Sequence, residues 1–356
     1  MAVKPRLTKQ LLLFILFGLL LLVVYFYYFV DTGNMASVIQ RTSLSIYALA
    51  FAAFVTSVLF SSLAWHSLLR NLNIKAKLPR VLLFMWVGMF FDAIVPEPGW
   101  SGDLSKAYLL AKSTEQDAGR IGASVIGQKI IVMVVTIVDL ILGLVLLSLN
   151  YTLSSMVLIF IVGVLFLSTF FLTMILYFSA KPKATKRLLE WLIRGIAFVR
   201  RGHWDSTDFQ TRAEDTLNRF HEGIRTLSAD PKTLLRPVTF SFMSWGFDVS
   251  VIFLAFSSLG YAVPVDKVLI VYALTGSLQA MGVSFVGFTE IVMSSAYNVL
   301  GILPAVSLFA TLLTRGVTLW FKLIVSYGAF QWAGAELLLG KNQELQPNLK
   351  ASGAIP

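Results

Sequence analysis

The sequence predicts an all-α, polytopic integral membrane protein with about six full spans and two re-entrant helical hairpins. Hydrophobic residues make up 57% of the 356 residues and charged residues only 13%, and the mean hydropathy is +0.77, which excludes an ordinary soluble domain. The apolar runs are long and uninterrupted, as helical spans require, and lack the alternation of a membrane β-barrel. The chain has no cysteine, so disulfides, thiolate metal sites and cysteine nucleophiles are excluded.

Six apolar runs have the length of a full span. They are Leu11–Val30, Ser45–Ala64, Ile121–Leu147, Ser154–Ser179, Val238–Leu259 and Pro304–Phe330. Cations precede the first run, as in a signal peptide. However, the run is too long for the apolar region of a signal peptide, and no small-residue cleavage site follows it. We therefore expect a retained first helix.

The segment Val81–Leu110 predicts the first hairpin. Its apolar run ends at Ile94 after about 14 residues, which as a helix would cover about 21 Å of a hydrocarbon core about 30 Å thick. Two prolines, Glu97, two glycines and Asp103 follow within nine residues. A backbone break at membrane depth is tolerated only inside protein or beside a watery cavity. A substrate site is therefore expected at this break.

The segment Val268–Ile302 predicts a second hairpin that enters from the opposite side. Gly282 and Gly287 permit a break, and Glu290 would open the helix that follows. The alternative is two full spans, if Pro304 only kinks the second of them. Two broken hairpins of opposite orientation would form an inverted repeat, a common plan in transporters.

The distribution of cations supports the hairpin arrangement. The polar stretch 181–236 holds twelve of the 29 lysines and arginines, and a full crossing by Val81–Ile94 would place it outside, against the positive-inside rule. With both hairpins in place, only Arg41 and Lys267 face outward. Four cations then remain within the membrane: Lys106, Lys129, Arg315 and Lys322. This bias also accounts for the net charge of +10 without nucleic-acid binding.

The chain is expected to divide into four regions. They are a membrane half at 1–180 with the first hairpin at 81–112, basic amphipathic helices on the cytoplasmic surface at 181–236, a second membrane half at 237–335 with the hairpin at 268–302, and a cytoplasmic tail at 336–356 that is expected to be disordered. Apolar residues recur at helical spacing within Lys186–Arg201 and Phe209–Leu227, which predicts two interfacial helices. We expect a multi-pass protein of the plasma membrane with both termini in the cytoplasm.

Charged side chains inside a membrane are costly and mark function or ion pairing. Asp103 and Lys106 share one helical face, so they can pair with each other or with a zwitterionic ligand. Asp103 could equally be a helix N-cap, and both interpretations stay open. Lys129 needs a partner, and Asp92, Glu97 and Asp103 are available.

The second motif combines an acid with cations on the last span. Glu290 has Arg315 and Lys322, two turns apart, as expected partners, and such a group can hold a lipid phosphate, relay a proton or stabilise the fold. The candidate substrate-binding residues are Glu97, Gly102, Asp103, Lys106, Lys129, Gly287, Glu290, Arg315 and Lys322, and the possible ion-pair residues are Asp92, Asp139 and Asp248. No catalytic motif, metal motif or phosphate loop occurs, so no catalytic residue, metal or cofactor is expected.

These motifs resemble those of the flippase-like family found as the transmembrane region of lysylphosphatidylglycerol synthases and as freestanding bacterial and archaeal proteins. The family pattern is Gly-Gly-Asp-x-x-Arg, an arginine in the next span, Pro-Gly-Gly-x-Gly-x-x-Glu, and Leu-x-x-Arg. The matching residues here are Ser101–Lys106, Lys129, Val283–Glu290 and Leu312–Arg315. Lysine replaces arginine at 106 and 129, serine replaces a glycine at 101, and the second motif lacks its proline and keeps only Gly287 and Glu290.

The resemblance implies a lipid flippase or transporter that moves a polar or aminoacylated phospholipid between leaflets. Its expected partners are membrane lipids, either an anionic or aminoacylated phospholipid or a lipid-linked glycan; no nucleic acid is expected, and a homo-oligomer is compatible with this function. The chain has no room for a soluble aminoacyl-transferase domain, so the lipid would be made elsewhere. The alternatives are a membrane glycosyltransferase or accessory protein that acts on a lipid-linked sugar, with Glu97, Asp103 or Asp31 as its acid, and a small-solute carrier.

Overall fold

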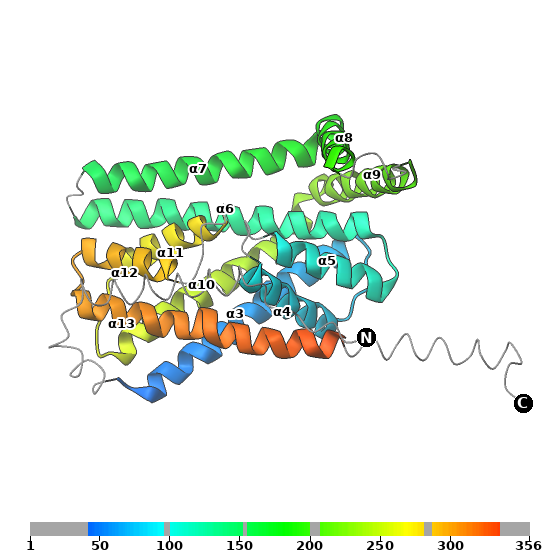
Figure 1. Cartoon of the computed structure of the whole chain (residues 1–356). Helices are drawn as coiled ribbons and strands as arrows, with labels where there is room; N and C mark the ends of the chain where they lie inside the picture. Colours follow the sequence, from blue (N-terminus) through cyan, green and yellow to red (C-terminus); the bar gives the residue numbers. More distant parts are fainter. Residues whose placement is uncertain (1–41, 96–99, 152–154, 200–206, 281–286, 335–356) are drawn as a thin grey trace, which may run out of the picture.

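The protein is helical throughout the part of the chain that the structure describes (Figure 1). This computed structural model describes residues 42–95, 100–151, 155–199, 207–280 and 287–334. The all-α class is therefore confirmed for these residues. The predicted first span Leu11–Val30 and the predicted tail at 336–356 lie outside them.

Within the described part of the chain, five helices are long and apolar enough to cross a bilayer. They are Leu44–Asn71, Ala118–Asn150, Val157–Ala180, Pro231–Ser258 and Pro304–Gly334, and they correspond to five of the six predicted spans. In Figure 1 they carry the labels α3 (Leu44–Asn71), α6 (Ala118–Asn150), α7 (Ser155–Ala180), α10 (Leu235–Ser258, after a short 3₁₀ turn at Pro231–Leu234) and α13 (Pro304–Arg315).

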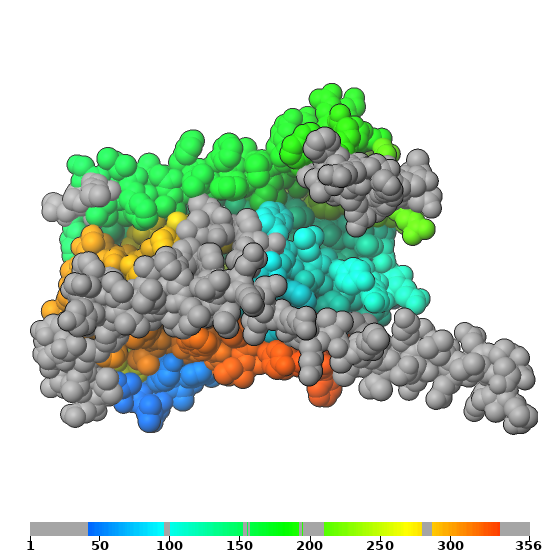
Figure 2. All heavy atoms as spheres, viewed as in Figure 1, coloured from blue at the N-terminus to red at the C-terminus, as the bar shows by residue number. Residues whose placement is uncertain are grey.

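Helix α7, green in Figure 2, lies at the edge of the bundle, and apolar side chains make up much of its exposed surface. Ile159 is 72% exposed and Phe166 is 73% exposed. No lysine, arginine, aspartate or glutamate occurs between Ser155 and Ala180. A helix that is apolar on its exposed face is expected to contact lipid, because water would make that exposure unfavourable.

The first predicted hairpin consists of two short packed helices, α4 (Leu78–Ile94) and α5 (Ser101–Thr114). The chain leaves the helical conformation after Ile94, as predicted. A side chain at Gly102 would collide with the backbone carbonyl of Gly88 and with the carboxylate of Asp92. Only glycine therefore allows α5 to approach α4 this closely. The re-entrant position of this hairpin in a bilayer stays a prediction.

The second predicted hairpin is also broken into two short helices, α11 (Val265–Ala280) and α12 (Phe288–Val299). Gly287 precedes α12 with a φ of +91°, which favours glycine. The alternative in which α12 continues past Pro304 as one kinked span is wrong, because the chain turns at Gly301 with a φ of +81° and α13 begins as a new helix. In Figure 1 the helices α4 and α5 occupy one end of the bundle, and α11 and α12 occupy the other.

The last span contains a π-helical segment that the sequence analysis did not predict. The segment Gly316–Phe321 follows directly after α13, and the helix then continues to Gly334. Tyr47 of α3 lies beside this change of geometry, where its hydroxyl donates to the backbone carbonyl of Leu313 over 3.0 Å. Segments of π-helix are rare and often occur at functional sites.

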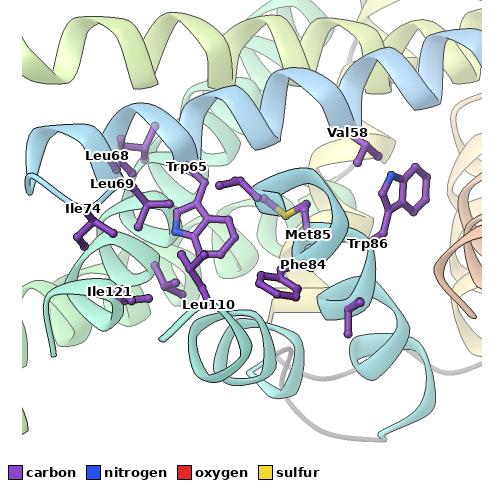
Figure 3. Packing of buried hydrophobic residues seen from close by; sticks show 14 of the residues in the cluster. Val58, Trp65, Leu68, Leu69, Ile74, Phe84, Met85, Trp86, Leu110 and Ile121 are labelled. Atoms are coloured by element: carbon purple, nitrogen blue, oxygen red, sulfur yellow. The ribbon is translucent and has the colours of Figure 1, made fainter. Parts of the chain in front are cut away.

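Two apolar cores hold the bundle together. The first lies among α3, α4, α5 and α6 and includes Trp65, Leu68, Phe84, Leu110 and Ile121 (Figure 3). The second lies among α6, α10, α11 and α12 and includes Leu140, Ile252, Phe256, Ile270 and Tyr297. Trp245 of α10 packs against both cores. Close packing of these side chains fixes the helices that carry the charged residues.

The basic region forms two amphipathic helices, α8 (Pro182–Val199) and α9 (Thr207–Ala229), as predicted. Helix α9 also packs on the start of α6, where a side chain at Gly223 would lie 2.7 Å from the Cβ of Ala123. Lys186 of α8 and Glu214 of α9 form an exposed ion pair of 3.0 Å. A largely apolar cavity of about 550 Å³ lies between α6, α8 and α9, and none of the candidate site residues lines it.

Candidate functional site

Three charged residues from the first hairpin and α6 form a buried cluster, the "lysine cluster" of Asp103, Lys106 and Lys129. The Nζ of Lys106 lies 2.8 Å from Oδ1 of Asp103, and the Nζ of Lys129 lies 2.8 Å from Oδ2. The three side chains are only 8%, 15% and 18% exposed for Lys106, Lys129 and Asp103. The predicted pairing of Asp103 with both lysines is confirmed. One carboxylate thus binds two ammonium groups.

Polar and aromatic residues around this cluster orient both lysines. Lys106 donates to Oε1 of Gln128 over 3.1 Å, and the amide of Gln128 in turn donates to the backbone carbonyl of Ser61 over 3.0 Å. The Nζ of Lys106 lies 5.1 Å from the ring centre of Trp65, and that of Lys129 lies 4.3 Å from the ring of Trp100, which stabilises both cations. Sequence analysis missed Gln128, although an amide next to Lys129 in an apolar span was an available signal.

Asp92 of α4 binds the start of α5 rather than a cation. Its Oδ1 accepts the backbone N–H of Gly102 over 2.8 Å and the hydroxyl of Ser101 over 3.4 Å. The residue before α5, Trp100, makes no side-chain capping bond. The expectation that Asp92 forms an ion pair is therefore wrong among the described residues. The N-cap interpretation of Asp103 is also wrong, because α5 begins at Ser101 and Asp103 lies inside its first turn.

A second buried pair joins α12 to α13. The Nε of Arg315 donates to Oε1 of Glu290 over 2.8 Å, and the backbone N–H of Gly287 donates to Oε2 over 2.8 Å. The side chains are 8% exposed for Arg315 and 4% exposed for Glu290. The predicted pairing of Glu290 with Arg315 is confirmed. Gly287 serves this pair through its backbone, in a helix-capping arrangement.

Lys322 does not pair with Glu290, in contrast to the prediction. The π-helical segment Gly316–Phe321 separates it from Arg315, and a π turn holds more residues than an α turn. The angle between the two side chains therefore differs from the one that a regular helix would give. Among the described residues Lys322 has no hydrogen bond and no ion pair. It lies within electrostatic range of Asp92, Asp248 and Arg315.

The two remaining acids that the structure describes, Asp248 and Asp139, differ in their hydrogen bonding. Asp248 accepts a 3.4 Å hydrogen bond from the hydroxyl of Tyr272 but forms no ion pair within the described part of the chain. Asp139 is 1% exposed, and neither of its carboxylate oxygens has a hydrogen-bond partner among those residues. Its predicted ion pair is therefore wrong there. Glu97 lies outside the described residues.

Charged groups from both hairpins thus meet the long helices inside the bundle. The lysine cluster connects α5 to α6, the pair of Glu290 and Arg315 connects α12 to α13, and Lys322 lies within electrostatic range of Asp92, Asp248 and Arg315. Such an interior can bind groups that carry both a phosphate and an ammonium, since it offers cations and carboxylates together.

Comparison with known proteins places this arrangement in a family. Residues 11–326 match the family described as the lysylphosphatidylglycerol synthase transmembrane region. The chain is 22% identical to a UPF0104 membrane protein of Pyrococcus horikoshii, with 81% of this chain and 87% of that protein covered. It is 23% identical to one of Methanothermobacter thermautotrophicus, with 80% and 84% covered, and 22% identical to one of Methanocaldococcus jannaschii, with 91% and 95% covered.

No solved structure matches the chain. The family match spans both hairpins and all the charged residues described above, and the relatives are membrane proteins matched over most of their length. The chain therefore belongs to the lysylphosphatidylglycerol synthase transmembrane-region family.

Proposed function

We propose that the protein moves a polar or aminoacylated phospholipid between the leaflets of the membrane, without itself catalysing a reaction. The headgroup would pass the residues Asp103, Lys106, Lys129, Glu290 and Arg315 while the acyl chains stay in lipid. Family membership and five helices of spanning length support a lipid-related function in a membrane. The charges inside the bundle support a polar path, because they would be costly without a ligand or a partner.

Lys322 is the observation that carries this proposal. Its ammonium has no hydrogen-bond or ion-pair partner in the described part of the chain, and it lies within electrostatic range of Arg315, Asp92 and Asp248. A lipid phosphate would supply the acceptor that this ammonium lacks. Asp103 already binds two ammonium groups at 2.8 Å, so the amine of an aminoacyl headgroup can replace one lysine there. The interior therefore suits a headgroup with both a phosphate and an amine.

Lipid translocation in proteoliposomes tests the proposal. Wild type, Asp103→Asn and Glu290→Gln are reconstituted with headgroup-labelled anionic, zwitterionic or aminoacylated lipids, and a membrane-impermeant quencher reports the label that reaches the outer leaflet. We expect wild type to expose the label quickly and both variants to lose this activity. Monodisperse elution and a native helical circular dichroism spectrum must accompany that loss.

A matched control separates the site from the fold. Thr169→Val removes a hydroxyl from the exposed helix α7, where it bonds only to the carbonyl of Leu165 in its own helix, and should translocate like wild type. If wild type behaves like empty liposomes with every lipid tested, the protein does not translocate lipid. If both site variants match wild type, the path does not run past Asp103 and Glu290.

A further inference from the structure

The buried acid Asp139 takes no part in either charged group. Asp139 of α6 is 1% exposed, and both of its carboxylate oxygens lack a hydrogen-bond partner among the described residues. It lies ten residues beyond Lys129, about 15 Å along the helix. This distance separates it from the lysine cluster and places it well inside the apolar span.

Among the described residues, the groups around Asp139 supply no positive charge. The indole of Trp245 on α10 lies close enough to interact with Asp139, but its Nε1 also lacks a hydrogen-bond partner in the described residues. From α11, Tyr272 lies within electrostatic range of both Asp139 and Asp248. The neighbouring helix α7 carries no charged residue between Ser155 and Ala180.

Close helix packing holds this environment in place. A side chain at Gly143, one turn after Asp139, would lie 3.0 Å from the backbone nitrogen of Ile270, so α6 and α11 approach closely at this level. Leu140 beside the carboxylate is 1% exposed and belongs to the second apolar core. The carboxyl group is thus enclosed in a medium of low dielectric constant, where a bare negative charge is strongly unfavourable.

The charge balance of the interior leads to the same residue. The spanning and hairpin helices contain five interior cations, Lys106, Lys129, Lys267, Arg315 and Lys322, and six interior acids, Asp92, Asp103, Asp139, Asp248, Asp266 and Glu290. The sequences 96–99, 281–286 and Leu11–Val30 add no lysine or arginine, and 96–99 adds the acid Glu97. Acids are therefore in excess, and Asp139 is the acid that neither an ion pair nor a hydrogen bond satisfies in the described structure.

We propose that Asp139 is a proton-binding site inside the membrane, and that exchange of its proton drives movement of the headgroup. The second clause rests on the proposed function; the first does not. Binding adds one proton from water to a carboxylate oxygen and removes one negative charge, and release reverses both changes. The hydroxyl of Tyr272, which is hydrogen-bonded to Asp248, connects Asp139 to the surroundings of Lys322, where a change of charge would act on a bound phosphate.

A metal cation fits this position less well than a proton. No three histidine, cysteine, aspartate or glutamate residues come together as metal ligands in the described residues, and hard cations require several oxygen ligands. The groups shown to interact with Asp139 are an indole and a phenol. A proton requires only the carboxylate itself.

Infrared difference spectroscopy on the reconstituted full-length protein tests the proton site without any lipid substrate. At neutral pH we expect wild type to show the carbonyl stretch of a protonated carboxylic acid, and this band should be lost in Asp139→Asn. Thr136→Val provides the matched control, because Thr136 is half-buried one turn earlier on α6 and its hydroxyl bonds only to the carbonyl of Val132. This variant should retain the band. If Asp139→Asn fails to fold, Asp139→Glu should shift the band. Identical spectra for wild type and the Asp139 variant would overturn the proton site.

A pH gradient across the proteoliposome membrane tests the coupling. An inward or outward gradient should accelerate lipid translocation by wild type and by Thr136→Val, and Asp139→Asn should lose this acceleration. Equal acceleration of Asp139→Asn would overturn the coupling. If wild type translocates no lipid at all, the proposed function and the coupling both fail, whereas the infrared band still decides whether Asp139 binds a proton.

Discussion

Removal of Arg315 should expose the energetic role of the buried pair that joins α12 to α13. The side chains are 8% exposed for Arg315 and 4% exposed for Glu290, and they meet at 2.8 Å, so they belong to the class of buried ion pairs. Breaking such a pair at one side leaves an uncompensated charge and costs about 3–5 kcal/mol. Glu290 keeps its bond from the backbone of Gly287, which places Arg315→Met at the lower end, about 3 kcal/mol. That corresponds to more than about a hundredfold change in the unfolding equilibrium.

A double-mutant cycle separates this effect from a loss of packing. Glu290→Gln keeps an oxygen that can accept the Gly287 N–H but leaves Arg315 without a counter-charge, so it should also cost about 3 kcal/mol. The double variant removes both charges and should cost much less than the sum, since the interaction energy of contacting residues is typically about 0.5–3 kcal/mol. The measurement is the free energy of unfolding in mixed micelles, followed by tryptophan fluorescence. Additive losses would refute the pair as an energetic unit.

The remaining predictions test the hairpin, the cation and the topology. Gly102→Ala should prevent the packing of α4 against α5 and lower the yield of monodisperse protein, because the added Cβ would collide with backbone atoms. Gly163→Ala is the control and should leave the yield unchanged, because no atom lies within 4 Å of the added Cβ. Equal yields of the two variants would contradict the close approach of α4 and α5. Lys322→Gln should weaken the binding of anionic lipids, measured by native mass spectrometry, and should leave the free energy of unfolding unchanged. Unchanged lipid binding would contradict the proposed role of Lys322 in binding a lipid phosphate. In the cysteine-free chain, an impermeant thiol reagent should label Leu149→Cys from outside intact cells and spare Lys183→Cys; the reverse pattern would refute the proposed orientation.

Much of the fold follows from local patterns that the tertiary structure leaves unchanged. Span length, the Pro/Gly break after Ile94 and the break before Phe288 depend on short-range chemistry: a helix needs about 20 apolar residues to cross lipid, and proline and glycine end it. The periodicity of α8 and α9 is equally local. These features appeared in the structure where the sequence predicted them.

The pairing of charged residues was only partly predictable. Helical spacing placed Lys106 near Asp103 because a turn has a fixed geometry, and the pairs of Asp103 with Lys129 and of Glu290 with Arg315 followed from the need of each buried charge for a partner. The same reasoning failed for Asp92, which accepts a hydrogen bond from the backbone of α5. The free N–H groups at the start of a helix can satisfy a buried carboxylate, so that it needs no cation as partner.

The sequence by itself determined that this chain is a helical membrane protein with two interrupted hairpins and charged residues within its apolar helices, because hydropathy, span length and helix breakers act over a few residues. Only the tertiary structure decided which charges meet. The π-helical segment before Lys322 changes the helical geometry between that lysine and Arg315. The close approach of α6 to α11 at Gly143 encloses Asp139, which has no hydrogen-bond partner among the described residues. Both outcomes depend on how distant helices pack, and side-chain packing between helices leaves no periodic signal in the sequence of either one.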